Sequence, residues 1–397
     1  MKQMLEKFTR RIETSGLVEP GGALFGMADD RIVWNRTDPA QKILEPLFSN
    51  LNINSVLFAR PAFPYSVIID FLAKTTRNST IMPDDCETRT FLHDLPVADA
   101  FSALKLNQCL KARKSVIVPG GSIVTTGTIS PEQALVAFSS VCFACFVKFF
   151  SDFLKHVQTD GVSKKEARLF SRIAPFCAEL RPAPAGLVHG PFSMEDEIRT
   201  AMAEAGKKTV EAGLVDSSFG NISCFNGKTL YISQTGAFLN KLEGFIDPVP
   251  TDGSRCTGIT ASSELGAHLN IISATKDHAI LHGHPLFSVI MSMVCDIEKC
   301  EKKGECHKSC PYDRNICQIP IVSGEVGAGP HGLCNTVACR MNDQKAVIVY
   351  GHGVFTTGKT DFNDALSRLY SIENDCRNEY FRRVRDVIGD ISNLMAS

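Results

Sequence analysis

An internal repeat is the feature that most constrains what this chain can fold into. Residues 116–135 align without gaps on residues 347–366, and nine of the twenty positions are identical. Both copies consist of a run of β-branched residues, a glycine turn, the tripeptide Thr-Thr-Gly and the predicted start of a helix. A repeat of this length indicates that one folding unit occurs twice in the chain.

Shorter motifs extend the repeat toward the beginning of each copy, and they occur in the same order. Residues 16–19 match 213–216, Phe25-Gly26 matches Phe219-Gly220, and residues 57–61 match 281–285. The spacing between matched positions grows along the chain, so the second copy is longer than the first. Each proline of the segment 181–186 disfavours helix at the residue before it, which is typical of an extended linker. We therefore predict a first module over residues 1–156, a linker over 157–190 and a second module over 191–397.

Charge and hydropathy exclude several classes of partner. The 397 residues carry 42 basic and 43 acidic side chains, a net charge of −1, so no global field attracts nucleic acid or an anionic membrane. The first residues lack an apolar core followed by a small-residue cleavage site, and we expect a cytoplasmic protein. The most apolar stretch, residues 134–147, is too short to cross a bilayer and is predicted to form a buried helix.

Three histidines of the second copy have no counterpart in the first. His282, His284 and His352 align with Phe58, Arg60 and Gly121. Residues two apart on a strand share a face, so the imidazoles of His282 and His284 point the same way. Three neutral imidazoles that leave a fourth position open are typical of a catalytic zinc site. His331 is the alternative third ligand, ranked behind His352 because no strand precedes its loop.

Small polar residues surround these histidines in the sequence. Glu264 opens a predicted helix, where it either caps the helix or acts as a general base beside the metal. The segments 220–223 and 233–236 are turns rich in small residues, able to direct N–H groups and hydroxyls at a phosphate.

Taken in order, these motifs resemble the class II aldolase and adducin family over about residues 192–385. The motifs are Gly-Asn-Ile-Ser at 220, Thr-Gly at 235, Ser-Ser-Glu at 262, His-Gly-His-Pro at 282 and Gly-His-Gly at 351. The resemblance implies an α/β fold made of two tandem three-layer αβα modules with a central, mostly antiparallel sheet, the first module being a degenerate copy. It also implies zinc held by His282, His284 and His352, with Glu264 moving protons. A substrate phosphate would lie against Asn221, Thr235, Gly236, Ser262 and Ser263.

The resemblance implies a reaction as well. Zinc would polarise the carbonyl of a ketose 1-phosphate, and cleavage would release dihydroxyacetone phosphate and an aldehyde. A sugar-phosphate dehydratase or a 4-epimerase would use the same zinc site, and a non-catalytic adducin-like scaffold is the alternative from another class. Gln234 departs from the proline that the family often has before the Thr-Gly turn. Because family active sites lie between subunits of a four-fold ring, we expect a homodimer that forms a four-module pseudo-ring, or a higher homo-oligomer.

Cysteines cluster beside the His-x-His motif. Five of the fifteen lie within residues 295–317, and four of these are candidate ligands: Cys300, Cys306, Cys310 and Cys317. Thiolates at these spacings are predicted to close a second zinc site or to hold an iron–sulfur cluster, with free surface thiols as the alternative. Zinc is favoured because the lysines of this segment indicate an exposed loop, which shields a cluster poorly.

Overall fold

The computed structural model describes residues 1–159, 161–179, 182–215, 219–254, 260–297, 299–327, 329–341 and 344–388. Within these ranges the chain forms two compact units. The first comprises Met1–Asp84, Thr88–Phe153 and Val162–Phe176. The second comprises Asp85–Glu87, Leu154–Gly161 and Cys177–Ser397. Each unit has its own sheet, and both sheets are mainly antiparallel, as the sequence predicts.

The first unit has a five-stranded sheet in the order β2-β1-β3-β7-β6, all antiparallel, and a small sheet of β4 and β5. Its strands are β1 (Leu24–Ala28), β2 (Ile32–Trp34), β3 (Ser55–Ala59), β4 (Thr80–Ile81), β5 (Leu95–Pro96), β6 (Ser115–Val118) and β7 (Ser122–Gly127). Its helices are α1 (Lys2–Thr14), α2 (Gln41–Asn50), α3 (Tyr65–Thr75), α4 (Cys86–Leu92), α5 (Ala103–Leu110), α6 (Pro131–Gln158) and α7 (Lys164–Ala178). The first residues of α4 and the last of α6 belong to the second unit.

Helix α6 contains the apolar stretch that the sequence predicts to be a buried helix. It is the one helix of the described residues that is long and apolar enough to cross a membrane, yet 89% of its most apolar window is buried in the structure. Phe153 of α6 stacks on Phe170 of α7 with ring centroids 3.8 Å apart. Phe149 meets Phe71 of α3 edge to face. The helix therefore packs as a core helix, and the prediction of burial is confirmed.

The second unit has an eight-stranded sheet in the order β10-β9-β8-β11-β15-β14-β13-β12, in which β13 and β14 form the one parallel pair of the described strands. Its strands are β8 (Asn221–Phe225), β9 (Thr229–Ser233), β10 (Ile246–Pro250), β11 (Ala279–Gly283), β12 (Arg314–Ile316), β13 (Ile319–Val322), β14 (Ala346–Val349) and β15 (Gly353–Gly358). Its helices are α8 (Glu195–Glu211), α9 (Leu265–Thr275), α10 (Leu286–Met293), η1 (Leu333–Asn335), α11 (Val337–Arg340) and α12 (Asn363–Ile388).

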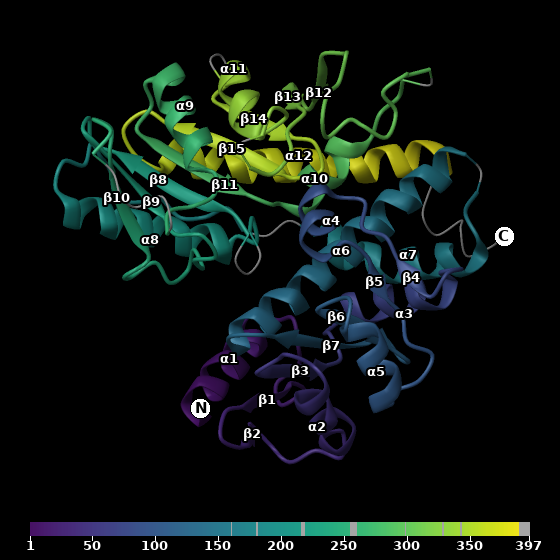
Figure 1. Cartoon of the computed structure of the whole chain (residues 1–397). Coiled ribbons are helices and arrows are strands. Elements are labelled where there is room, and N and C mark those ends of the chain that lie inside the picture. The colour runs from purple at the N-terminus through teal and green to yellow at the C-terminus, as the bar shows by residue number, and fades with distance from the viewer. Residues whose placement is uncertain are drawn as a thin grey trace. The chain divides into compact units, whose positions relative to one another are not determined.

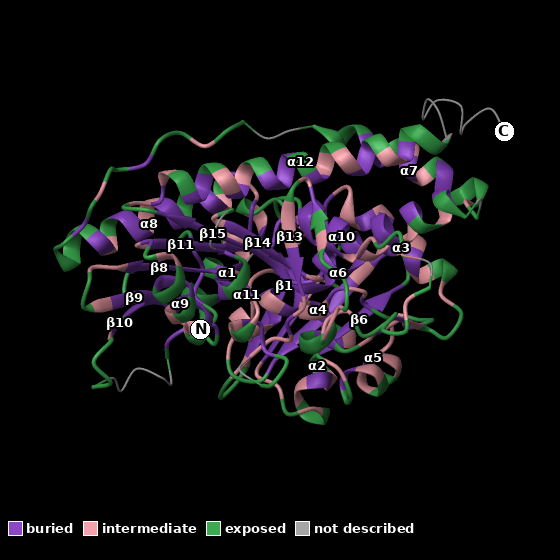
Figure 2. Cartoon of the chain, turned by 90° about the horizontal axis from the view of Figure 1, so that it is seen from above, coloured by how far each residue is buried: buried purple, intermediate pink, exposed green. Residues whose placement is uncertain are grey.

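Helices cover both faces of this sheet. Helix α12 runs along strands β11 and β15 (Figure 1), and in the view from above α9 lies on the other side of these strands (Figure 2). On the α9 side Ile271 packs into one cluster with Ile280 of β11 and Phe355 of β15. On the α12 side a side chain at Gly283 would meet Leu369. Alternate residues of β11 therefore face α9 and α12 in turn.

The two sheets share one arrangement over five strands. The order β2-β1-β3-β7-β6 of the first unit has the same sequence of neighbours as β9-β8-β11-β15-β14 of the second. Leu57 lies opposite Thr125 in the first sheet, and Leu281 lies opposite Thr356 in the second. These pairs are the ones that the sequence repeat aligns.

Hydrogen bonds outside the strands repeat in the same way. Thr125 Oγ1 donates to the carbonyl of Ala134 at 2.7 Å, and Thr356 Oγ1 donates to that of Ala365 at 2.9 Å. The backbone N–H of Thr126 donates to Lys114, and that of Thr357 to Lys345. The correspondence thus extends from strand order to single bonds.

One short motif of the predicted alignment is displaced. Phe25 lies opposite Leu57 in the first sheet, whereas Ile222 lies opposite Leu281 in the second. Phe25 is therefore structurally equivalent to Ile222, which lies three residues beyond the Phe219 that the sequence alignment selects. Gly220, next to Phe219, has a φ of +86° and precedes β8, so the Phe-Gly pair of the second copy lies before the strand and not within it.

The segment predicted as a linker, 157–190, is not extended throughout. It contains α7, a helix of 15 residues whose Phe170 packs against α6. The described residues from 182 to 193 carry no regular secondary structure, as the prolines predict. Asn363 at the start of α12 anchors this stretch, since its side chain accepts the N–H of Leu187 at 2.8 Å.

Candidate metal centre

Two of the three histidines lie at the end of strand β11. The strand ends at Gly283, and His282 and His284 flank that glycine. Both side chains are buried, at 0% and 3% exposed. A Cβ at Gly283 would lie 2.7 Å from the carbonyl oxygen of Leu214, so this position requires glycine. The His-x-His pair is therefore held by close packing around the strand end.

The third histidine comes from the turn between β14 and β15. His352 is 1% exposed, and its neighbour Gly353 leaves room for the other two rings. A Cβ on Gly353 would lie 2.8 Å from His282 Cε1 and 3.1 Å from His284 Cδ2. The glycine thus permits the approach of three imidazoles, and the structure brings together the three histidines that the sequence singled out.

The three imidazoles form a donor set that fits a metal ion. One nitrogen from each ring lies within 4.8 Å of the others. His282 Nε2 and His284 Nε2 are 2.9 Å apart, while His282 Nδ1 lies 3.0 Å from the carbonyl oxygen of Val354. Because that carbonyl can only accept, Nδ1 of His282 carries the proton and Nε2 presents its lone pair to the centre of the group. Neutral imidazole nitrogens held in this way suit zinc.

Glu264 lies at the edge of the same group. Its carboxylate oxygens are 2.9 Å from His352 Nε2, 3.4 Å from His282 Nε2 and 2.7 Å from the Asn221 amide nitrogen, which donates to it. The residue immediately precedes α9, yet its side chain makes no capping bond to that helix. Its carboxylate therefore lies beside the histidine group and does not cap the helix.

Burial and charge set the protonation of the group. Burial alone would raise the pKa of Glu264, but the imidazoles of His282 and His352 and the Asn221 N–H hold it well below its usual value. Burial lowers the pKa of His282 to about 4 and also that of His284. Burial would lower the pKa of His352 too, but the carboxylates of Glu264 and Glu87 raise it to about 10. An ionised Glu264 and two neutral imidazoles result.

Glu87 is a neighbour of the site that sequence reasoning missed. Residues Asp85–Glu87 belong to the second unit by their contacts, although they lie early in the sequence. The N–H of Cys86 donates to the carbonyl of Gly351 at 2.6 Å, and Glu87 Oε2 lies 3.2 Å from His352 Nδ1. A carboxylate on the ring nitrogen that does not face the metal is a common way to orient a ligating histidine. No local motif marks Glu87, because nothing near it in the sequence carries the other ligands.

The residues predicted to hold phosphate lie next to this group. Asn221 and Ser262 are buried and both contact Glu264, whose N–H donates to Ser262 Oγ at 3.3 Å. Thr235 Oγ1 donates to the carbonyl of Ala261 at 3.0 Å, which ties the Thr-Gly turn to the same place. Gly236 has a φ of +74°, as a tight turn requires. Ser263 is exposed beside Ser262. Phosphate binding by this set stays a prediction.

The turn also accommodates Gln234 in place of proline. Its side-chain amide donates to Asp247 Oδ1 at 2.8 Å, and its backbone N–H donates to Phe245. Both contacts fix the loop without a proline ring.

The structure does not bring the four candidate cysteines together. Among the described residues, which include Cys300, Cys306, Cys310 and Cys317, the three histidines form the one group close enough to hold a metal. Instead Cys317 lies within hydrogen-bond reach of Cys376 on α12, a contact that lowers the pKa of Cys317. Cys317 lies in the turn between β12 and β13, while Cys300 and Cys306 lie among the turns before β12. A second metal centre at these cysteines stays a prediction, which the arrangement of the described residues does not support.

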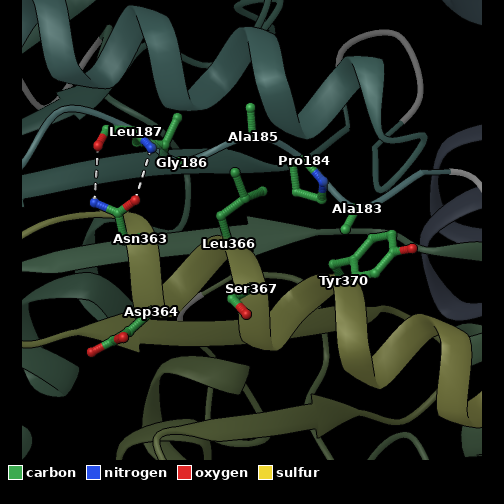
Figure 3. A pocket seen from close by; sticks show the side chains of 10 residues that line it. All are labelled: Ala183, Pro184, Ala185, Gly186, Leu187, Asn363, Asp364, Leu366, Ser367 and Tyr370. Carbon is green, nitrogen blue, oxygen red and sulfur yellow. Dashed lines mark hydrogen bonds between the residues drawn. The ribbon is translucent and has the colours of Figure 1, made fainter.

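Two other features lie apart from the histidines. His331, the alternative third ligand, is exposed and outside the group. A cavity of about 270 Å³ lies between the segment 183–187 and α12, where Asn363 bonds to both backbone groups of Leu187 (Figure 3). Its lining includes one carboxylate, Asp364, and no histidine or cysteine. The chemistry of this unit is therefore concentrated at the His group.

Part of the second unit matches a known family. Residues 200–380 match the family described as Class II Aldolase and Adducin N-terminal domain. This part of the chain is similar to class II aldolases, and the resemblance seen in the sequence motifs is confirmed.

Individual proteins are also similar to this part of the chain. The L-fuculose phosphate aldolase of Methanocaldococcus jannaschii is 29% identical over 174 residues, which cover 43% of this chain and 89% of that protein. Among solved structures, the L-fuculose-1-phosphate aldolase of Thermus thermophilus is 20% identical and covers 49% of this chain and all of that chain, with a TM-score of 0.40. A sugar-phosphate aldolase from Thermotoga maritima is 19% identical over 48% of this chain and 95% of its own, with a TM-score of 0.34.

Proposed function

We propose that this protein is a zinc-dependent lyase that cleaves a ketose 1-phosphate to dihydroxyacetone phosphate and an aldehyde. The observation that carries the proposal is the buried group of His282, His284 and His352 with the carboxylate of Glu264 beside it. The similarity to L-fuculose phosphate aldolase supports the same class of reaction. An adducin-like scaffold without chemistry has no use for three buried imidazoles that share one centre.

Each residue of the group has a role that its position supports. His282, His284 and His352 would hold the zinc ion. Zinc supplies a Lewis acid that polarises the substrate carbonyl and stabilises the negative charge left by cleavage of the carbon–carbon bond. Glu264 stays ionised, so it accepts the proton of the substrate hydroxyl that becomes the aldehyde, and it returns a proton to the other fragment.

We propose further that the substrate phosphate lies against the turns beside Glu264. Asn221 and Ser262 present an amide N–H and a hydroxyl, while Thr235, Gly236 and Ser263 present a hydroxyl or backbone N–H groups at the exposed side. Donors of this kind bind phosphate without a net positive field, which agrees with the near-zero net charge of the chain.

The first unit is, in this proposal, a degenerate copy of the same module. Its sheet has the same five-strand order, while Phe58, Arg60 and Gly121 replace the three histidines. Such a copy can build an interface without catalysing a reaction. We propose a homodimer in which four modules form a pseudo-ring, located in the cytoplasm. A mass measurement in solution tests the assembly, because a monomer at working concentration contradicts it.

The first prediction concerns activity. Protein purified without chelator should contain zinc and should release dihydroxyacetone phosphate from at least one of a deoxypentulose, a deoxyhexulose and a methylthiopentulose 1-phosphate.

Glu264→Gln should keep the metal and lower turnover by about a hundredfold or more, the usual cost of losing a general base. Coupled assay of dihydroxyacetone phosphate and metal analysis provide the two measurements.

The control for these variants is His331→Asn, which alters an exposed histidine outside the group and should change neither metal content nor turnover. Protein that binds no divalent ion would contradict the enzyme proposal as a whole. Metal-loaded protein that eliminates water from the substrate, or converts it to its epimer, would replace the lyase reaction with that of a dehydratase or epimerase. Near-normal turnover in Glu264→Gln would remove Glu264 from proton transfer.

A further inference from the structure

His268 lies one turn into α9 and is completely buried, at 0% exposed. Both nitrogens of its ring have close polar neighbours on β8. Nδ1 lies 2.6 Å from Ser223 Oγ, and Nε2 lies 2.5 Å from Asn221 Oδ1. Asn221 in turn donates from its amide nitrogen to Glu264 Oε2 at 2.7 Å. A continuous chain of hydrogen bonds therefore leads from a serine in the core to the carboxylate at the metal group.

The placement of the Asn221 amide fixes the direction of every bond in this chain. Its nitrogen lies 2.7 Å from Glu264 Oε2, so the NH₂ group donates to the carboxylate. The carbonyl oxygen of the amide then faces His268, which must donate to it from Nε2. A neutral ring that carries its proton on Nε2 has an accepting Nδ1, so Ser223 donates its hydroxyl proton to that nitrogen. All four groups are satisfied in this one arrangement.

The opposite arrangement is unfavourable at the same four residues. If His268 carried its proton on Nδ1, Nε2 would accept and the Asn221 amide would turn over. The amide oxygen would then face the Glu264 carboxylate, two acceptors about one hydrogen-bond length apart, in a site where little water screens them. The position of one proton on His268 therefore selects the orientation of an amide at the reaction site.

The first unit provides an independent observation. Comparison of the two sheets shows which positions are equivalent. Leu24 lies opposite Phe58 in the first sheet and Asn221 lies opposite His282 in the second, so Leu24 is equivalent to Asn221 and Gly26 to Ser223. Both polar members on β8 are therefore absent from the unit that lacks the metal-ligating histidines. A chain needed only for packing would have no reason to disappear together with the ligands.

We propose that His268 is a positioning residue that fixes the Asn221 amide with its NH₂ toward Glu264 and toward the substrate phosphate. An amide nitrogen carries two N–H groups, and one of them is used by Glu264, which leaves the other for an anion. This inference rests on the proposed function for the identity of that anion, and on the hydrogen bonds alone for the orientation of the amide. Ser223 serves the same purpose one step further away, since it holds the proton of His268 on Nε2.

The orientation can be tested without substrate. In protein labelled with ¹⁵N-histidine, long-range ¹H–¹⁵N correlation spectra should show His268 as a neutral ring protonated at Nε2. Ser223→Ala removes the donor to Nδ1 and should allow the other tautomer to appear in the same spectra. Wild-type protein with the proton of His268 on Nδ1 would overturn the proposal.

The consequence for anion binding needs a second measurement, with inorganic phosphate as the probe and the zinc-loaded full chain as the protein. Ser223→Ala and His268→Leu should weaken phosphate binding by about tenfold, the effect of one lost hydrogen bond to a charged group. His268→Gln keeps an N–H donor and should retain most of the affinity. Zinc affinity, measured by competition with a chelator, should stay within about twofold of wild type in all three, because the metal ligands are untouched.

Ser55→Ala is the matched control, since Ser55 is also a buried serine on a strand and lies in the first unit. It should leave phosphate binding unchanged. Unchanged phosphate binding in Ser223→Ala and His268→Leu would overturn the positioning role even if His268→Leu destabilises the fold, because Ser223→Ala removes only one oxygen. If wild-type protein has the expected tautomer but cleaves no ketose 1-phosphate, the proposed function fails and the orientation of Asn221 stands.

Discussion

At the scale of single residues, glycines decide whether the three histidines can meet. A side chain at Gly283 would collide with the carbonyl oxygen of Leu214. A side chain at Gly353 would collide with the rings of His282 and His284. Any larger residue would displace a ring by the width of a methyl group, which is comparable to the tolerance of a metal site. Each imidazole therefore depends on a neighbour that contributes only its backbone.

The contact between Glu87 and His352 leads to a prediction at this scale. Glu87→Gln removes the carboxylate 3.2 Å from His352 Nδ1 while preserving the shape of the side chain. We expect zinc affinity to fall by about tenfold or more, the usual cost of losing a carboxylate that orients a ligating histidine. Chelator competition on the purified protein measures this directly, without any assay of activity.

Glu325→Gln is the matched control for that variant. Glu325 also lies beside a histidine, His307, at 3.8 Å, but that histidine is not part of the metal group. Its zinc affinity should equal that of wild type. Equal affinities in both variants would show that Glu87 does not orient His352.

At the scale of secondary structure, α12 stabilises both the sheet and the start of α10. Asp361 accepts the N–H of Asn363 at the beginning of the helix, which satisfies one of its unpaired donors. Further along, the buried Glu373 accepts the N–H groups of Phe287 and Ser288 in the first turn of α10. Because α10 follows His284 and Pro285 directly, α12 helps to fix the end of the metal-binding strand.

Charged contacts near the end of α12 predict a dependence of stability on pH. Hydrogen bonds from Arg382 and Arg383 lower the pKa of Glu379 to about 2, from a usual value of 4.5. A carboxylate whose pKa is lowered in the folded state stabilises it above the usual pKa, and that contribution disappears as the pH falls toward about 2. We expect the urea midpoint of wild type to exceed that of Glu379→Gln near neutral pH, and the difference to shrink as the solution is acidified.

The exposed loop residue Glu301 provides the comparison, because Glu301→Gln should leave the midpoint nearly unchanged at every pH. A constant difference between wild type and Glu379→Gln from pH 7 to 3 would contradict the assignment. Since Glu379 is only partly buried and its partner Arg382 is exposed, the effect is expected to be small and to weaken with added salt.

At the scale of the whole molecule, two units with the same strand order differ in their chemistry. The first unit has Phe58 where the second has His282, and Phe58 stacks on Phe101 with centroids 4.7 Å apart. An aromatic pair therefore occupies the first sheet at the position that His282 has in the second. One chain should consequently bind one catalytic metal ion.

Metal stoichiometry tests this view of the molecule. Elemental analysis should give one zinc ion per chain, in accordance with the single histidine group of the described residues. Replacing Cys300, Cys306, Cys310 and Cys317 together by serine should not change that value, whereas His282→Asn should abolish it. Two metal ions per chain, one of them lost in the cysteine variant, would restore the second metal centre that the structure argues against.

The sequence by itself identified the class of fold, the buried helix at 134–147, the three histidines and Glu264. These features are visible because strand periodicity, glycine turns and a histidine pair are local patterns, and the second copy could be compared with the first. The comparison also made three separate histidines recognisable as one group. The family resemblance followed from the same short motifs.

The tertiary structure alone decided which distant residues meet. Glu87 contacts His352 across more than two hundred and fifty residues of sequence, and His268 on α9 reaches Asn221 on β8. The four cysteines are close in sequence, yet among the described residues they do not form a group close enough to hold a metal. Short-range patterns report backbone conformation, whereas contacts between distant segments depend on how the sheet is ordered and packed, and the sequence motifs do not encode that order locally.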